Sequence, residues 1–488
     1  MASSATPSVH FYLLILLVVL LAPRLGGSSQ YTGYTRGGKH FVLRSSGAQR
    51  PPPAPTSCST ISLFGGGGGI ARPDSSFISS GDGGGIARKL PVLHRLSPCS
   101  PLNTSTLALR GFLRRSGSLG RPHSRLLNSG ATIPTTGIPF PTLPGASEFH
   151  IVVGYGTPAQ KLAVSFDTTL GATFIRCKTR ADDAIGKAFH PSRSSSIVQV
   201  SCGSPECPLK SCSGPSCTVT ESKDGSMVFN ATAVMDTLTL SQETQENIRA
   251  ICLEMGSETS ESLSGIVDLS WDNHSLASRA PSSPDTVAFS YCLPSTIVAQ
   301  GFLSIGAPRP ERSRHFVVYT PLWTNTLLPN MYIVRLTKLD VSGVDVKIPY
   351  APHAGNAMFV LDTTFTYLKP ETYTILHEQF KSQMTEYRVA PSMGDLDTCY
   401  NFTGLTRMSM PSITLWFEGW AYIVPGMEQM MYFGRRGDIF SVGCLAFAAA
   451  SDLPPGITAV IGTLLQERTE VVYDVHGGKM GFSHKQCW

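Results

Sequence analysis

The sequence predicts an all-β protein made of two similar lobes. From residue 148 to the C-terminus, short apolar runs recur between glycine, proline, asparagine and serine residues, a pattern typical of strands joined by turns. About 340 residues exceed what one hydrophobic core usually holds, so two domains are expected. Two apolar segments that each end in Asp-Thr-Thr lie 195 positions apart, at Asp167 and Asp362. Such a repeat suggests two lobes that each deliver one carboxylate to a shared site.

The N-terminus has the features of a secretory signal over residues 1–29. An apolar run at 11–22 is followed by small residues at 26–29 that suit a cleavage site. A run of 12 residues is shorter than the about 20 that span a membrane comfortably, so an uncleaved anchor is the less favoured alternative. We expect a secreted protein with no stable membrane anchor, in the extracellular space or apoplast, with the vacuole or a plastid as alternatives.

Residues 30–147 differ in composition from a folded domain. They contain a run of three prolines, a run of five glycines and a repeated Gly-Gly-Gly-Ile-Ala-Arg, and such a chain buries too little apolar surface to offset its entropy. Residues 1–148 carry 14 Lys and Arg against 3 acidic residues, whereas the remainder carries 25 against 31. A basic arm can bind nucleic acid, but the secretory signal argues against that partner. We interpret the segment as a disordered basic pro-segment that docks on the acidic body or stays solvated.

The cysteine content fits an oxidising compartment. Of the 12 cysteines, 10 follow residue 176, and 5 of these gather between residues 177 and 217. The five contain no Cys-x-x-Cys pair of the kind that marks a zinc site, so we expect disulfides, no metal and no organic cofactor. Four sequons permit glycosylation without requiring it: Asn103, Asn230, Asn273 and Asn401.

Strands and one clear helix can be placed along the body of the chain. Pro370 opens the helix, which we expect over 371–384 because proline suits a first helical turn. The expected strands are 149–153, 161–166, 173–176, 227–240, 302–305, 332–341, 412–417 and 471–473.

A series of motifs in this order resembles the plant nepenthesin-like branch of the pepsin-like aspartic proteases. They are Phe149–Pro158, Phe189–Ser196, Val200–Cys202, Phe289–Pro294, Leu396–Tyr400, Cys444–Phe447, Val460–Gly462, Val471–Asp474 and Gly481–Phe482.

The resemblance implies two β-barrel lobes that flank a substrate cleft, an N-terminal catalytic lobe at 148–315 and a C-terminal catalytic lobe at 316–488. It also implies a zymogen that acts as a monomer on a polypeptide, and a disulfide between Cys399 and Cys444.

By motif match, Asp167 and Asp362 are the catalytic pair of that family. Two carboxylates that share a water cannot both ionise cheaply, so they hold one proton between them and titrate in two steps. The charged carboxylate would act as general base on the water, while the protonated one polarises the substrate carbonyl. The hydroxyls of Thr168 and Thr363 match the positions where the family makes hydrogen bonds between its lobes.

Both catalytic turns depart from the family pattern of Asp-Thr/Ser-Gly followed by Ser or Thr. In the first lobe, Thr169 replaces the glycine and Leu170 replaces the next hydroxyl. A β-branched side chain crowds the space that glycine leaves open, although the Thr169 hydroxyl could act as a substitute from a shifted position.

The turn of the second lobe departs further. Alignment through Pro370 and Tyr373 leaves the span from Asp362 about two residues short. We therefore expect a contracted turn in which Thr364 replaces the glycine and Phe365 stands where a hydroxyl would follow. A misplacement of about 1 Å can cost on the order of a hundredfold in rate.

Two further positions disagree with the family. The flap is expected at Ser222, Lys223, Asp224 and Gly225, where Ser222 stands in place of a tyrosine that positions substrate. Asp268 replaces the glycine of a supporting segment that begins at Ile266.

Two hypotheses remain open. One is an aspartic endopeptidase that cleaves peptide bonds at acidic pH, with activity weakened by the altered turns. The other is an inactive protein on the same fold that binds peptide, protein or polysaccharide.

Overall fold

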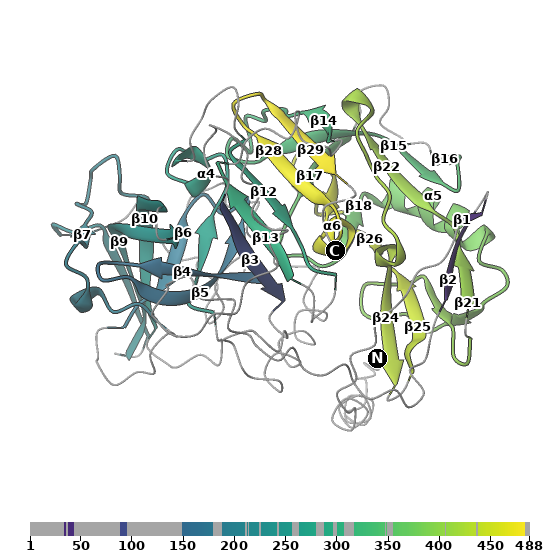
Figure 1. The fold of residues 1–488 in the computed structure, drawn as a ribbon, viewed down its shortest axis with the longest axis horizontal. Coiled ribbons are helices and arrows are strands. Elements are labelled where there is room, and N and C mark those ends of the chain that lie inside the picture. The colour runs from purple at the N-terminus through teal and green to yellow at the C-terminus, as the bar shows by residue number, and fades with distance from the viewer. Residues whose placement is uncertain are drawn as a thin grey trace, which may run out of the picture.

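The computed structural model describes two β-rich lobes (Figure 1). The described residues are 34–35, 38–42, 88–94 and most of 149–483, with gaps at 179–187, 210–211, 213, 224–225, 242–243, 256–262, 280–286, 296–299, 307–316, 347, 349–354, 406 and 436–437. The signal expected at 1–29 and the lobe boundary expected at 315 lie outside them.

The first lobe is built from antiparallel hairpins around a central crossing. β11 lies between β5 and β6, parallel to the former and antiparallel to the latter. Its strands are β4 (Phe149–Tyr155), β5 (Gln160–Asp167), β6 (Thr173–Arg176), β7 (Val198–Gln199), β8 (Thr218–Lys223), β9 (Ser226–Ser241), β10 (Thr244–Met255) and β11 (Gly265–Asp268). Its short helices are η3 (Pro191–Arg193) and α4 (Leu276–Arg279).

The second lobe repeats this crossing with β27 between β17 and β18. One sheet holds β15 (Ile333–Val341), β16 (Val344–Val346), β17 (Gly355–Phe359), β18 (Thr366–Leu368), β22 (Ile413–Phe417), β23 (Tyr422–Ile423), β26 (Phe447–Ala449) and β27 (Ile457–Ile461). A smaller sheet holds β19 (Arg388–Ala390), β20 (Cys399–Asn401), β24 (Met430–Arg435) and β25 (Asp438–Leu445).

The predicted helix is present as α5 (Pro370–Ser382). Proline at its first position and Glu371 in its first turn suit a helix N-terminus. Tyr373, Leu376 and Phe380 recur at helical spacing and are buried. The remaining short helices of this lobe are η5 (Glu418–Trp420), η6 (Met427–Gln429) and α6 (Thr463–Gln466).

A sheet with strands from both halves of the chain joins the lobes. Its strands follow the order β14 (Val318–Pro321), β29 (Lys479–Ser483), β28 (Glu470–Asp474), β12 (Phe289–Cys292), β13 (Gln300–Ile305), β3 (Arg88–His94) and β4. Phe289 and Tyr473 stack across the β12–β28 pairing with ring centroids 4.2 Å apart. The lobes therefore share one continuous core.

The expectation that all of residues 30–147 are disordered is wrong for the described part of this segment. β3 pairs with β13 on one side and β4 on the other, and its Leu90 and Val92 are buried. Both side chains are apolar at alternate positions, which is what a strand between two neighbours requires. Farther upstream, β1 (Tyr34–Thr35) pairs with β2 (Gly38–Val42), and β2 pairs with β21 (Arg407–Met410).

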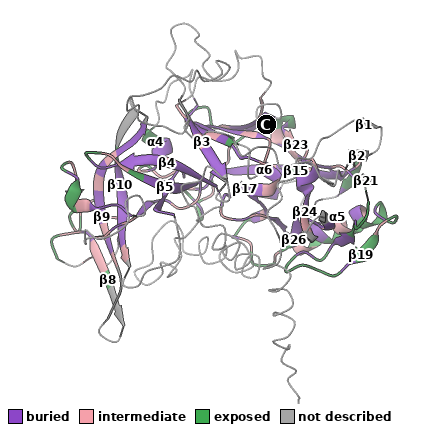
Figure 2. Cartoon of the chain, turned by 60° about the horizontal axis from the view of Figure 1, so that its bottom comes forward, coloured by how far each residue is buried: buried purple, intermediate pink, exposed green. Residues whose placement is uncertain are grey.

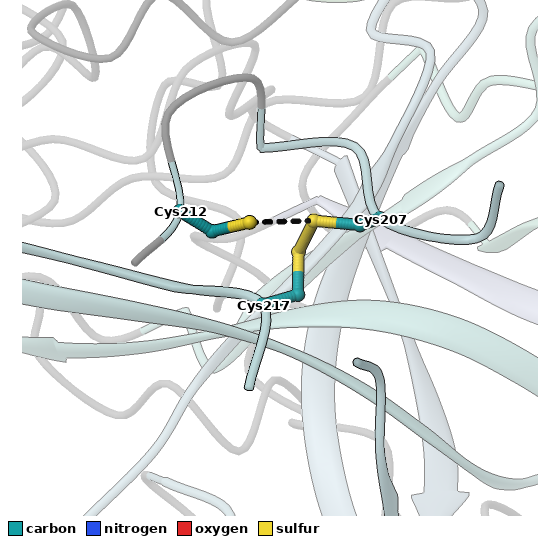
Figure 3. A group of neighbouring side chains, drawn as sticks. All are labelled: Cys207, Cys212 and Cys217. Carbon is teal, nitrogen blue, oxygen red and sulfur yellow. Dashed lines mark hydrogen bonds between the residues drawn. A yellow bond between two sulfur atoms is a disulfide. The ribbon is translucent and has the colours of Figure 1, made fainter. Parts of the chain in front are cut away.

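Four disulfides join described cysteines. They are Cys177–Cys252, Cys202–Cys212, Cys207–Cys217 and the Cys399–Cys444 bond that the family resemblance implies. Figure 3 shows Cys212 beside the Cys207–Cys217 bond, with 3.6 Å between the sulfurs of Cys207 and Cys212. These three sulfurs lie close enough to hold a metal, but each is already in a disulfide.

Buried residues follow the sheets of both lobes and the sheet between them (Figure 2). Among the described residues, no helix has the length and apolar character needed to cross a membrane.

The burial of β3 predicts a stability effect at Val92. Val92→Ala removes two methyl groups from a side chain that is 0% exposed, so we expect the free energy of unfolding to fall by about 2 kcal/mol. Urea unfolding measures it. The control is Val198→Ala in β7, where the valine is 59% exposed and little change is expected. Equal effects of the two changes would show that β3 does not contribute to the core.

Candidate active site

Asp167 ends β5 and is fully buried. The backbone N–H and the hydroxyl of Thr169 both donate to its Oδ1, each at 2.6 Å. The second oxygen, Oδ2, is buried and has no hydrogen-bond partner among the described residues. Thr169 thus supplies the substitute hydroxyl considered from the sequence, and one carboxyl oxygen is left for a ligand or water.

The pKa of Asp167 is raised from 3.8 to about 8. Burial is the largest cause, followed by the nearby charge of Asp362, while the hydrogen bonds from Thr169 act in the opposite direction. Asp167 therefore keeps its proton at acidic and neutral pH. The contribution of Asp362 indicates that the two carboxyl groups lie close enough to interact.

Hydrogen bonds tie the two lobes together beneath Asp167. The Thr168 hydroxyl donates to the Phe359 carbonyl at 3.1 Å, so Thr168 makes the contact between lobes that its motif position implies. A second path runs from the Tyr291 hydroxyl to Gln466 Oε1 at 2.6 Å, and from Gln466 Nε2 to the Val360 carbonyl at 2.8 Å.

Strand pairing shows which residues of the two lobes are equivalent. Ile266 of β11 lies opposite Ser165 and Phe174, and Val460 of β27 lies opposite Met358 and Tyr367. Met358 lies 193 positions after Ser165, and Tyr367 lies 193 positions after Phe174, so both partners of the central strand give the same offset between the lobes.

Side-chain hydrogen bonds give the same offset. The Asp268 N–H donates to the Thr173 hydroxyl oxygen at 3.0 Å, and the Gly462 N–H donates to the Thr366 hydroxyl oxygen at 3.2 Å. In each case the backbone N–H is the donor and the threonine oxygen accepts.

This register makes Val360 the counterpart of Asp167. The contraction expected in the second turn is therefore wrong, because the same number of residues separates 167 from 174 and 360 from 367. Asp362 is instead the counterpart of Thr169, so it occupies the position of the family's turn glycine. Thr364, which we placed at that glycine, lies two residues farther along.

The hydroxyl positions change accordingly. Thr363, not Phe365, is the counterpart of Leu170, so the second turn keeps the hydroxyl that we expected it to lack. The Thr363 hydroxyl donates to Asp362 Oδ1 at 3.1 Å. The counterpart of Thr168 is Leu361, which has no hydroxyl to offer the other lobe. Alignment of the second turn through Thr366 rather than through Asp-Thr-Thr would have revealed this from the sequence.

Comparisons with known families agree with the two-lobed architecture. Residues 149–307 match the family described as "Xylanase inhibitor N-terminal", and residues 331–484 match "Xylanase inhibitor C-terminal". An aspartyl protease family protein of Arabidopsis thaliana is 28% identical over 445 residues, which cover 86% of this chain and 91% of the relative. Aspartic proteinase nepenthesin-2 of Nepenthes gracilis is 26% identical over 77% of this chain and 86% of its own length. The chain belongs to the plant pepsin-like aspartic protease family.

Solved structures share the fold of this protease family member at low sequence identity. The crystal structure of edgp superposes with a TM-score of 0.53 at 17% identity, over 69% of this chain and 91% of that one. Conglutin gamma, a basic 7S globulin from lupine seeds, gives a TM-score of 0.53 at 15% identity, over 70% and 92%.

The residues that we expect to form the flap lie in the β8–β9 hairpin. Ser222 pairs with Met227 and Lys223 with Ser226, which closes the hairpin over two residues. Those two residues, Asp224 and Gly225, lie outside the described part of the chain.

The first lobe carries a second buried acid beside Asp167. Asp268 lies opposite Asp167 in the parallel pairing of β11 with β5 and is almost completely buried. Its pKa is raised to about 7, mainly by burial, although hydrogen bonds from Ser270 and Gly171 lower it. This protease family member thus buries two acids side by side in its first lobe.

The raised pKa values predict that acid stabilises the protein. Between pH 4 and 7 the folded chain retains protons on both Asp167 and Asp268 that the unfolded chain has lost, and Asp167 retains its proton up to about pH 8, so stability falls as the pH rises. Each group contributes a slope of up to about 1.4 kcal/mol per pH unit between its two pKa values. Urea unfolding at several pH values should show a smaller slope for Asp167→Asn, and the wild-type slope for the exposed control Asp345→Asn. An unchanged slope in Asp167→Asn would contradict the raised pKa.

Proposed function

We propose that this protein binds a polypeptide segment between its lobes and has lost efficient peptide-bond hydrolysis. The observation that carries the proposal is the β17–β27 register, which puts Val360 where the family's second catalytic aspartate belongs.

Hydrolysis by this family needs two carboxyl groups in different protonation states on either side of one water. Asp167 is the neutral member, because its pKa is raised to about 8. It can polarise a carbonyl but cannot take a proton from water while it still carries its own. The isopropyl group of Val360 cannot act as a base. The residue equivalent to Asp167 is thus unable to complete the reaction.

Peptide binding, unlike hydrolysis, does not require a second carboxyl group at this site. The free Oδ2 of a protonated Asp167 can donate to a peptide carbonyl, and the fold retains the hairpin that covers bound peptide in the family. We also propose that the protein is secreted, which the signal predicted at residues 1–29 and the disulfides of both lobes support.

Slow hydrolysis at acidic pH is the second candidate, and the influence of Asp362 on Asp167 favours it. Thr169, at the equivalent position of the first lobe, reaches the carboxyl group of the residue two places before it. Asp362 lies near enough to raise the pKa of Asp167. It could therefore supply a displaced carboxylate from the glycine position.

A proteolysis assay separates the two candidates. We expect acid-treated wild-type protein to cleave denatured casein between pH 3 and 6 no faster than Asp167→Asn. The double change Val360→Asp with Asp362→Gly restores the family's pair and should raise cleavage by on the order of a hundredfold, since position dominates such chemistry. Pepstatin-sensitive cleavage by the wild type that disappears in both Asp167→Asn and Asp362→Asn would instead establish the displaced pair.

Binding is tested with pepstatin A by isothermal titration calorimetry. Asp167→Ala should weaken binding by about tenfold, because one hydrogen bond from a buried group is lost. Asp345→Ala, at an exposed site in β16, serves as control. Absence of wild-type binding to pepstatin A and to casein peptides alike would contradict the proposed function.

A further inference from the structure

The two catalytic turns follow different paths because of one residue in the central crossing. In the second lobe, a Cβ added to Gly462 would lie 2.1 Å from the Phe365 carbonyl oxygen and 2.6 Å from that of Thr364. Real Cβ atoms are not found that close to backbone, so the second turn packs where only glycine fits. The equivalent residue of the first lobe is Asp268, and its turn must run elsewhere.

The first turn has a left-handed backbone conformation at Gly171, and a hydrogen bond to Asp268 holds it there. Gly171 has a φ of 73°, in the left-handed region that favours glycine. Its N–H donates to Asp268 Oδ1 at 3.3 Å. Ser270 holds the same carboxyl group, donating to Oδ1 from its N–H at 2.9 Å and to Oδ2 from its hydroxyl at 3.1 Å. Ser270 thus holds the Asp268 carboxyl group in place, independently of its hydrogen bond with the turn.

We propose that Asp268 is a positioning residue that holds the first-lobe turn at Gly171 and thereby sets the place of Asp167. The turn is fastened at two points: Thr169 binds the carboxyl group of Asp167, and Asp268 binds the N–H of Gly171. Leu170, between these points, has no hydroxyl to contribute. In the second lobe the turn packs its backbone against Gly462. In the first lobe Asp268 and the left-handed Gly171 replace that packing with a hydrogen bond.

This inference builds on the proposed function, since it explains how the ligand-binding Asp167 is held. Its test needs no ligand, so its result stays readable if peptide binding fails. The method is hydrogen-exchange mass spectrometry on the full chain, with fragments that resolve residues 168–171.

Three substitutions at Asp268 separate loss of the carboxyl group from a change that keeps a hydrogen-bond acceptor. Asp268→Asn keeps an acceptor of the same size, so exchange at Thr169 and Gly171 should stay within about twofold of wild type. Asp268→Gly, which installs the family residue, removes the anchor and should speed exchange at both amides by about tenfold. Asp268→Ser shortens the side chain and should act in the same direction, which keeps the test available if the glycine variant does not fold.

Asp340 is the matched control. It is also nearly buried, and its Oδ1 accepts the N–H of Gly343, which has a φ of 84°. Asp340→Gly should speed exchange near residue 343 and leave residues 168–171 at the wild-type rate. The proposal is overturned if loss of the Asp268 carboxyl group speeds exchange at Gly171 alone while Thr169 keeps its rate, or if Asp268→Asn behaves like Asp268→Gly.

Discussion

Parallel pairing of β11 with β5 and of β27 with β17 decides what chemistry the site between the lobes can perform. In a strand ladder, a shift of one residue turns every side chain to the opposite face, so the register leaves no freedom over which residue ends each catalytic strand. In the first lobe β5 ends at Asp167, and in the second β17 ends at Phe359, so that Val360 directly follows it at the position equivalent to Asp167. Backbone hydrogen bonds maintain this frame, and it therefore persists when a side chain essential for hydrolysis is replaced.

The contact from Thr168 to the Phe359 carbonyl shows how the frame survives. It needs a hydroxyl from only one lobe, because the acceptor is backbone. Gln466 adds support from below by binding the Val360 carbonyl rather than its side chain. Neither contact depends on the identity of residue 360. The lobes can thus remain joined in the manner of a protease while the reacting groups change.

Much of the fold could be predicted from the sequence because its signals are local. Alternating apolar residues revealed β5, β9 and β15, and Pro370 with a helical apolar stripe revealed α5. The second turn could not be predicted in the same way. Identical Asp-Thr-Thr letters in both lobes suggested an equivalence that long-range pairing with β27 refutes. β3 was missed because its short apolar alternation sits in a segment of low-complexity composition.

The departures around Asp167 also look different once their contacts are known. Taken singly, Thr169, Leu170 and Asp268 each count against an orderly turn. Together with the left-handed Gly171, they form a consistent set in which each change accommodates another. Neighbouring substitutions of this kind are not additive, so their number says little about how well the turn is formed.

The position of β3 between β13 and β4 has a consequence for maturation. A protease that cut the chain after His94 and before Phe149 would produce two polypeptides, yet the smaller would still be bound as an inner strand. The product would separate into two bands on a denaturing gel and elute as a single species from a sizing column. Removal of the leader would then be a matter of unfolding the centre of the molecule, not of diffusion from its surface.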